Sequence, residues 1–413
     1  MSKKNLVTYE GNDLGVVYEK DHTSFRLWAP TAESVELCFY ANGDGGEADE
    51  VVQMEKSEGG TWFYVKEGDL HKLYYTYKVT VDGVTRESND PYAKAAGVNG
   101  RRSMVVDLAK TNPEGFTEDK GPEVKKWTDI VVYEMSVLDT TSDESCGAKN
   151  PGKYIGLTET GLKTPEGVAT GLDHILDLGV THVQIMPAYD FGSIDESKPE
   201  VPQYNWGYDP INYNLPEGSF STDPFHGEVR IKEFKQMVQS FHEHGLGVIM
   251  DVVYNHTYDI DNNCFQKCVP DYYYRITEDG EYSDASACGN EVASDHQMCS
   301  KFIIDSLQYW ASEYHIDGYR FDLMGVLDIE TMNKAAVELK KINPNIVIYG
   351  EGWTGGPSTI PDEERALKCN VPALVDVGAF SDDIRDTIRG HVFYEEEVGY
   401  ISGKQNMEND IRY

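Results

Sequence analysis

Between residues 130 and 380 the sequence alternates between two kinds of apolar segment. Six short runs are rich in β-branched and aromatic residues, and the longer runs between them carry apolar residues at three- and four-residue spacing. The short runs are typical of buried strands and the longer runs of amphipathic helices. Strands that alternate with helices are joined by right-handed crossovers into a parallel sheet. The expected strands are 130–137, 181–187, 246–254, 318–325, 345–353 and 373–380.

A parallel sheet of this kind either closes into a barrel or stays open as a doubly wound sheet. Dinucleotide-binding sheets need a Gly-x-Gly-x-x-Gly turn between a strand and a helix, whereas Gly245-x-Gly247 precedes a strand here. We therefore predict a (β/α)8-type barrel over residues 128–413. A closed barrel needs eight strands, and only a polar, Glu-rich tail follows residue 390, so we expect an incomplete barrel of about six βα units.

The N-terminal part of the chain follows a different pattern. Short alternating segments are separated by turn-rich stretches, which predicts an antiparallel β-sandwich over residues 1–110. Residues 111–127 are rich in Pro, Gly and charge, so we interpret them as a linker or a wrap over the surface. The predicted fold class is multidomain, a β-sandwich followed by an α/β barrel. The clearest alternating segments are 24–30, 34–40, 61–68 and 74–83.

Composition narrows the partners and the location. Asp and Glu outnumber Lys and Arg by 71 to 36, and the net charge of −35 argues against nucleic acid and anionic membranes as partners. The sequence contains no run near the roughly 20 apolar residues of a membrane span, and the basic N-terminus has no apolar run behind it, so we predict a cytoplasmic protein. The seven cysteines are expected to be free thiols and not disulfides. The cluster of Cys264, Cys268, Cys288 and Cys299 is expected to lie in solvated loops and not to form a zinc site. The oligomeric state stays open.

The stretch "HIDGYRFDLMGV", residues 315–326, places two opposite charges in an apolar run. Strand alternation puts Arg320 and Asp322 on one face, close to the C-terminal end of the strand. Catalytic groups of βα barrels lie at these ends. A guanidinium this close favours the ionised carboxylate, which a nucleophile requires. The alternative interpretation is a structural ion pair.

A second carboxylate, Glu351, follows the next expected strand and is itself followed by Trp353. We expect Asp322, beside an Arg, and Glu351, after an apolar run, to lie in unlike surroundings. Two such carboxylates can have their pKa values pushed apart, so that one attacks and the other donates a proton during glycoside cleavage. Taken alone, Glu351 is equally well explained as an acid that caps the next loop.

Two further strand ends carry groups that suit a sugar. In the segment "DVVYNHT" Asp251 comes early, and Asn255 and His256 lie where the third strand meets its loop, so these polar groups can hydrogen-bond to hydroxyls. The loop after the second strand contains "YNWGYDPINYN", whose rings offer flat faces and whose Asp209 is an acceptor. Core packing is the other explanation for these rings. The rings are Tyr204, Trp206, Tyr208 and Tyr213.

"DVVYNHT", "GYRFDLMG" and "YGEGW", in this order, resemble three signature segments of the α-amylase superfamily of glycoside hydrolases. "YNWGYDP" resembles the signature of the type I pullulanases, which hydrolyse α-1,6 branch linkages in pullulan, glycogen and starch-derived dextrins. The segment "LGVVYEKDHTSFRLWAPTAESVELCFY" is similar to the isoamylase-type β-sandwich that precedes debranching barrels. The resemblance covers nearly the whole chain and implies a retaining debranching hydrolase that acts on α-glucan without a cofactor.

The resemblance also implies roles for single residues. Asp322 would be the nucleophile and Glu351 the general acid and then base, while Arg320 would hold Asp322. Tyr208 would stack under the sugar and His256 would bind its hydroxyls. The remaining implied contacts are Trp206, Asp209, Asp251, Asn255 and Trp353. Calcium is possible in the loop after the third strand, but Cys264 and Pro270 stand where an EF-type loop needs Gly and Glu, so we assign no metal ligand.

The sequence departs from the family in two respects. Ser136 and Leu138 stand where the family more often has His and Arg. The third carboxylate of the family, its last barrel strands and its C-terminal β domain have no counterpart, so we expect a truncated chain. These departures leave open an inactive fragment, a non-catalytic α-glucan-binding protein, or an α-1,4-acting amylase or glucanotransferase of the same superfamily.

Overall fold

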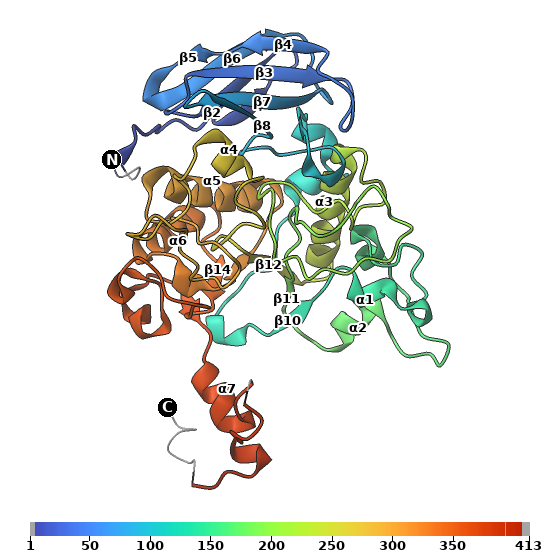
Figure 1. Ribbon diagram of the computed structural model, residues 1–413. Coiled ribbons are helices and arrows are strands. Elements are labelled where there is room, and N and C mark those ends of the chain that lie inside the picture. Colours follow the sequence, from blue (N-terminus) through green and yellow to red (C-terminus); the bar gives the residue numbers. More distant parts are fainter. Residues whose placement is uncertain (1–4, 393, 407–413) are drawn as a thin grey trace.

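The molecule consists of a layered β domain that lies against a larger α/β body (Figure 1). The structure is a computed structural model that describes residues 5–392 and 394–406. The β domain contains two sheets, one with the order β1-β2-β6-β5 and one with the order β4-β3-β7-β8, to which β9 adds beside β7. Its strands are β1 (Gly15–Tyr18), β2 (His22–Trp28), β3 (Ser34–Tyr40), β4 (Glu50–Gln53), β5 (Glu55–Lys56), β6 (Thr61–Glu67), β7 (Tyr74–Val81), β8 (Val84–Ser88) and β9 (Ser103–Met104).

Aromatic side chains hold the two sheets of the β domain together. Phe25 on β2 meets Phe39 on β3 and Tyr75 on β7 edge to face, with ring centroids 5.5 and 5.2 Å apart. Every second residue of β2 faces this core, as period-two alternation requires. The predicted β-sandwich is confirmed.

The α/β body is built on a six-stranded parallel sheet whose strands follow one another in chain order. Within the described residues the two outer strands, β10 and β15, do not pair with each other. The prediction of part of a (β/α) barrel with about six strands is therefore confirmed. The strands are β10 (Val132–Met135), β11 (His182–Ile185), β12 (Gly247–Val252), β13 (Gly318–Phe321), β14 (Val347–Gly350) and β15 (Gly378–Ala379).

Amphipathic helices connect these strands, where the periodicity predicted them. Helix α6 begins after Asp328, whose carboxylate accepts from the backbone N–H of Thr331 at 2.8 Å, and it ends with two lysines that complement the helix dipole. Helix α7 extends away from the sheet (Figure 1). The helices are α1 (Asp139–Ser142), α2 (Gly171–Asp177), α3 (Gly227–Glu243), α4 (Cys264–Cys268), α5 (Gln297–Glu313), α6 (Ile329–Ile342) and α7 (Asp382–Arg389).

A strap, residues 112–121, runs from the β domain over the outer helices. Phe116 stacks on His315 with ring centroids 4.4 Å apart. His242 on α3 donates to Asp119 at 2.7 Å and to Asp317 at 2.9 Å. Burial alone would lower the pKa of His242, but these two carboxylates raise it to about 9. The strap is thus fastened by a charged imidazolium between two acids.

The structure also bears on the predictions for the cysteines and for a membrane span. All seven cysteines are free, but Cys264, Cys268 and Cys299 are buried, so the prediction that the loop cysteines are solvated is wrong for these three. Their thiols pack in an apolar core under the β domain instead, because Cys264 and Cys268 lie on helix α4 and not in an open loop. None of the helices in the described ranges is long and apolar enough to cross a membrane.

Candidate functional site

The C-terminal ends of β12, β13 and β14 bring four charged side chains together. The register of the parallel strands places Asp251 opposite Arg320. Asp322 follows the last residue of β13, and Glu351 follows the last residue of β14. Parallel strands end at the same edge of the sheet, so these side chains share one region. The sequence prediction that Asp322 and Glu351 come from adjacent strand ends agrees with this placement.

Arg320 is the centre of this group. Its Nη1 donates to Asp251 Oδ1 at 2.9 Å and to Asp322 Oδ1 at 3.1 Å. Its Nη2 donates to Glu351 Oε1 at 2.6 Å. Arg320 thus lies beside Asp322 as expected and also binds Asp251 and Glu351, because the guanidinium presents two Nη groups and the sheet register brings all three acids within reach. The exposed fractions of the side chains are 0% for Asp251, 9% for Arg320, 13% for Asp322 and 18% for Glu351.

Burial and charge make the three carboxylates chemically different. Burial raises the pKa of Asp251 to about 8, although the charge of Arg320 opposes the shift. Burial also raises the pKa of Glu351 above its usual range, again against Arg320. For Arg320, burial works toward a lower pKa, but the charges of Asp251 and Glu351 outweigh it and raise the pKa. The carboxyl of Asp251, which keeps its proton to higher pH, therefore binds the same guanidinium as Asp322, which Arg320 and Asn255 hold.

Hydrogen bonds close a network around Asp322. Its Oδ2 accepts from Asn255 Nδ2 at 2.8 Å, and Asn255 Oδ1 lies 2.6 Å from His256 Nδ1. His256 Nε2 lies 2.9 Å from the backbone carbonyl of Tyr208, and the Tyr208 hydroxyl donates to Asp251 at 2.7 Å. Both ring nitrogens of the buried His256 are thus used within the protein, and burial lowers its pKa. Of the predicted contacts, Asp251 belongs to the charged group, and Tyr208, Asn255 and His256 surround it.

The remaining predicted residues make their contacts elsewhere. Trp206 is 61% exposed, and its indole N–H donates to the Tyr204 hydroxyl at 2.9 Å. Asp209 accepts from Asn205 Nδ2 at 2.8 Å inside its own loop. Trp353 packs near Phe380, with ring centroids 6.4 Å apart. These three side chains lie on the rim of the site or in the loops that support it, and not among the four charges.

Sequence reasoning missed two features of the site. The backbone N–H of Leu323 donates to Glu351 Oε2 at 3.0 Å, and Leu323 has a left-handed backbone with φ of 40°. Such strain in a branched residue is costly and collects at functional sites, yet no sequence signal marks it. Tyr349 donates to Gln184 Oε1 at 2.5 Å, and Gln184 donates to Glu134 at 3.0 Å, which continues the polar layer across β11 and β10. Strand alternation could have predicted this second feature, because it places Glu134, Gln184 and Tyr349 within strands of one sheet.

A second group of three acids lies in the loops after β11. Asp190, Glu196 and Glu217 each offer an oxygen within 4.8 Å of the others, a spacing that a metal ion would tolerate. The guanidinium of Arg230 already lies there, with Nη2 2.8 Å from Glu196 Oε2 and Nη1 3.4 Å from Asp190 Oδ1. This cluster therefore has an internal cation.

In the loop considered for calcium, Asp259 accepts from Asn262, and Asn263 caps α4 through a bond to Phe265 N.

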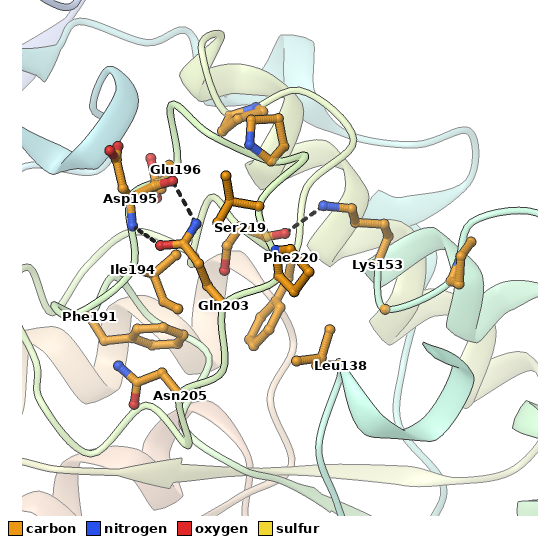
Figure 2. A pocket seen from close by; sticks show the side chains of 16 residues that line it. Leu138, Lys153, Phe191, Ile194, Asp195, Glu196, Gln203, Asn205, Ser219 and Phe220 are labelled. Atoms are coloured by element: carbon orange, nitrogen blue, oxygen red, sulfur yellow. Dashed lines mark hydrogen bonds between the residues drawn. The ribbon is translucent and has the colours of Figure 1, made fainter. Parts of the chain in front are cut away.

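A pocket next to this second group is lined by the loops that follow β10 and β11 (Figure 2). Phe191, Ile194 and Phe220 give it an apolar wall. Its polar groups are largely used among themselves, as in the bonds between Gln203 and Asp195. The pocket is separate from the carboxylates at the strand ends.

The fold and the charged group define part of a catalytic domain of the α-amylase class. The family profile described as "Alpha amylase, catalytic domain" matches residues 132–286. A second profile, "Carbohydrate-binding module 48 (Isoamylase N-terminal domain)", matches residues 13–93. The chain is thus a pullulanase homologue with a carbohydrate-binding module 48 domain ahead of this catalytic region.

The relatives are similar over almost the whole of this chain. The pullulanase of Bacillus subtilis (strain 168) is 38% identical over an alignment of 405 positions that covers 96% of this chain and 54% of that protein. Pullulanase 1, chloroplastic, of Arabidopsis thaliana is 32% identical over 96% of this chain and 46% of that protein. The crystal structure of the Paenibacillus barengoltzii pullulanase in complex with maltohexaose and α-cyclodextrin superposes with a TM-score of 0.97 and 46% identity, covering 99% of this chain and 64% of that one. The chain spans about half the length of these curated relatives.

Proposed function

We propose that the protein to which this chain belongs cleaves α-1,6-glucosidic branch linkages in pullulan, glycogen and dextrins with retention of configuration. The observation that carries this proposal is the guanidinium of Arg320, which holds Asp322 and Glu351 together at the C-terminal edge of the sheet. The motif "YNWGYDP" and the pullulanase homologues support the choice of linkage. The substrate is accordingly an α-glucan, as the maltohexaose complex of the Paenibacillus barengoltzii relative suggests.

In the first step Asp322 attacks the anomeric carbon of the glucose whose α-1,6 bond is cleaved, and a β-glucosyl ester forms. Glu351 gives its proton to the departing oxygen of the branch-point sugar, so that the leaving group departs as an alcohol. In the second step the Glu351 carboxylate takes a proton from water. The water oxygen attacks the same carbon and releases Asp322. Two inversions at one carbon retain its configuration.

The surroundings of the two acids suit these roles. Burial raises the pKa of Glu351, so this carboxyl keeps its proton to higher pH and can act as the acid. Asp322 accepts hydrogen bonds from Arg320 and Asn255, which stabilise its carboxylate. Retention also requires the carboxyl groups to lie about 5 to 5.5 Å apart.

We assign the sugar contacts to the residues around this pair. Tyr208 lies with its ring under the sugar at the cleaved bond, and its hydroxyl is fixed by Asp251. His256 and Asn255 are buried and bonded within the protein, so we assign them to brace Tyr208 and Asp322 at the same ring. Trp206 and Trp353 contact more distant glucose units at the rim. Asp209 braces the loop that carries Tyr208. The cytoplasmic location stays a prediction.

Incubation of the 413-residue chain with pullulan, beside an Asp322→Asn variant, tests the proposal. Maltotriose from the unsubstituted chain alone is the expected result, because cleavage of α-1,6 bonds in pullulan releases this sugar. Panose would identify an α-1,4-acting enzyme. Equal background release from both chains would rule out catalysis by this 413-residue chain, and retained calorimetric binding of maltotetraose would show that the chain binds glucan without turnover. Proton NMR of the first product formed distinguishes retention from inversion.

A further inference from the structure

The β domain reaches the α/β body through the tip of a tight turn, residues 97–102. The turn is closed by the bond from Gly97 N to Arg102 O, at 2.9 Å, and by a bridge between Ala96 and Ser103 that continues into β9. Asn99 lies at its tip with φ of 59°, a left-handed backbone that Asn tolerates better than most residues. The core of the β domain therefore fixes where the Asn99 side chain lies.

Asn99 makes three hydrogen bonds to two consecutive residues of the loop after β11. Its backbone N–H donates to Glu196 Oε2 at 2.6 Å, and its Oδ1 accepts from the backbone N–H of Glu196 at 2.7 Å. Its Nδ2 donates to Asp195 Oδ1 at 3.0 Å. The side chain of Asn99 thus binds both a backbone group and a side chain of the loop. Two such bonds fix the position of the loop relative to the turn.

The far side of this contact is held rigidly. Glu196 is buried and accepts from Arg230 and from Gly218 N at 2.9 Å, so its carboxylate cannot move without breaking a buried ion pair. The neighbouring Gly100 packs so closely that a Cβ there would lie 2.4 Å from Asp190 Oδ2. The turn of the β domain and the Arg230 group therefore fit as one rigid junction.

From this junction two sets of hydrogen bonds, joined by the backbone at Tyr204, hold the loop as far as Tyr208. Asp195 N donates to Gln203 Oε1 at 2.7 Å, and Gln203 Nε2 donates back to Asp195 O at 3.0 Å. Figure 2 shows Gln203 between Asp195 and Asn205, on the wall of the pocket. Asn205 Oδ1 then accepts from Gly207 N at 2.9 Å, directly before Tyr208. The loop from 195 to 208 is thus tied at one end to Asn99 and at the other to Asp251.

We propose that Asn99 is a positioning residue through which the β domain holds the Tyr204–Tyr208 segment at the mouth of the site. The inference rests on the proposed function for its effect on glucan, whereas the placement of the loop can be tested without it. The β domain would then be part of the substrate site by its contact with the loop, in addition to any sugar that it binds itself. Loss of the Asn99 side chain should raise KM or Kd and leave kcat almost unchanged, because the bonds to Asp322 and Glu351 are untouched.

The test variant is Asn99→Gly, measured in the full chain. Glycine takes a φ of 59° without strain and keeps the backbone N–H that donates to Glu196, so only the two side-chain bonds are lost. The control is Tyr92→Phe, which removes another hydrogen bond between the β domain and the α/β body, from Tyr92 to Asp305 at 3.1 Å, away from the loop. Unfolding curves establish that both variants are folded.

Two readouts follow, and the second, a rise in KM without a fall in kcat, is the one that a purely structural role would not produce. Hydrogen exchange of the 203–209 segment should be about tenfold faster in Asn99→Gly, the size that loss of roughly one net hydrogen bond gives, and unchanged in Tyr92→Phe. The Kd for maltotetraose and the KM for pullulan should rise by about threefold to tenfold in Asn99→Gly alone, with kcat within a factor of about two.

Unchanged exchange of the 203–209 segment in Asn99→Gly would overturn the proposal, as would an equal change in Tyr92→Phe. If the unsubstituted chain neither binds maltotetraose nor cleaves pullulan, the proposed function fails. The exchange result then still decides whether Asn99 positions the loop.

Discussion

Arg320 and Arg230 are each surrounded by three carboxylates, but the two groups are built for different tasks. At Arg230 the side chains of the Arg, Asp190, Glu196 and Glu217 are all at most 3% exposed. The acids also accept from backbone amides, such as Gly218 N to Glu196 and Ser219 N to Glu217. At Arg320 two of the three acids are partly exposed. Asp322 accepts from the side chains of Arg320 and Asn255, and Glu351 accepts from Arg320 and from one backbone amide, that of Leu323.

The difference teaches what separates a reactive charge group from a structural one. Backbone amides cannot move away, so the Arg230 group is locked into one arrangement. Partial exposure leaves Asp322 and Glu351 able to exchange partners during a reaction, and the Asp322 carboxylate is held by side-chain donors. The number and type of charged residues are nearly the same in both groups. What differs is the origin of their hydrogen bonds and their access to solvent.

The largest expected effect separates the two groups by activity. Glu351→Gln should lower the rate on pullulan by about 10² to 10⁴, the usual contribution of a general acid. Glu196→Gln should lower it far less, because Glu196 touches no reacting atom. Initial rates on pullulan measure both. With maltosyl fluoride, whose leaving group needs no proton, Glu351→Gln should regain the first step, and failure to do so would count against Glu351 as the acid.

The second effect concerns stability and runs in the opposite direction. Arg230→Met should lower the free energy of unfolding by about 3 to 5 kcal/mol, because it leaves buried carboxylates without a cation. Arg320→Met should cost less, since water can reach Asp322 and Glu351. Urea unfolding of both variants gives the two values. Equal losses would mean that the Arg320 group is as structural as the Arg230 group.

The pH dependence of stability should distinguish Asp190 from Asp251. Burial raises the pKa of Asp190 to about 7 and that of Asp251 to about 8, from an ordinary 3.8. Each therefore binds a proton on folding, and its contribution to stability is present below pH 4 and lost as pH rises through 7 or 8. The slope is about 1.4 kcal/mol per pH unit and group. Unfolding from pH 4 to 9 should lose this slope up to pH 7 in Asp190→Asn and up to pH 8 in Asp251→Asn; slopes like those of the unsubstituted chain would contradict both assignments.

The smallest expected effect lies at the exposed rim. Trp206→Ala should change the free energy of unfolding by less than about 0.5 kcal/mol, because the ring is largely exposed. It should weaken maltotetraose binding several-fold, since an aromatic face that stacks on a sugar is lost. Calorimetry and urea unfolding give the two numbers. Unaltered binding would remove Trp206 from the proposed sugar contacts.

The two Arg groups also mark what could be predicted from the sequence. Strand period and strand ends placed Arg320, Asp322 and Glu351 at one edge, because regular elements impose a repeating geometry. The sharing of Arg320 by three acids depends on the register of Asp251 against Arg320, which the pattern leaves open. The Arg230 group lies mainly in irregular loops, where no period relates Asp190 to Glu217. The left-handed Leu323 gave no signal, since only its neighbours impose that backbone.

Strand β13 is held by hydrogen bonds at both of its ends. At its start Asp317 is tied to Val248 N at 2.8 Å, to Val347 N through its carbonyl and to His242 at 2.9 Å. At its end Arg320 is tied to Asp251 and Glu351. A strand of four residues that is held at both ends bends very little, so the Asp322 carboxylate that follows it is placed with small tolerance. Above pH 9, where His242 loses its charge, its bond to Asp317 at the start of β13 weakens. The position of Asp322 at the other end should then become less fixed before the fold itself is lost.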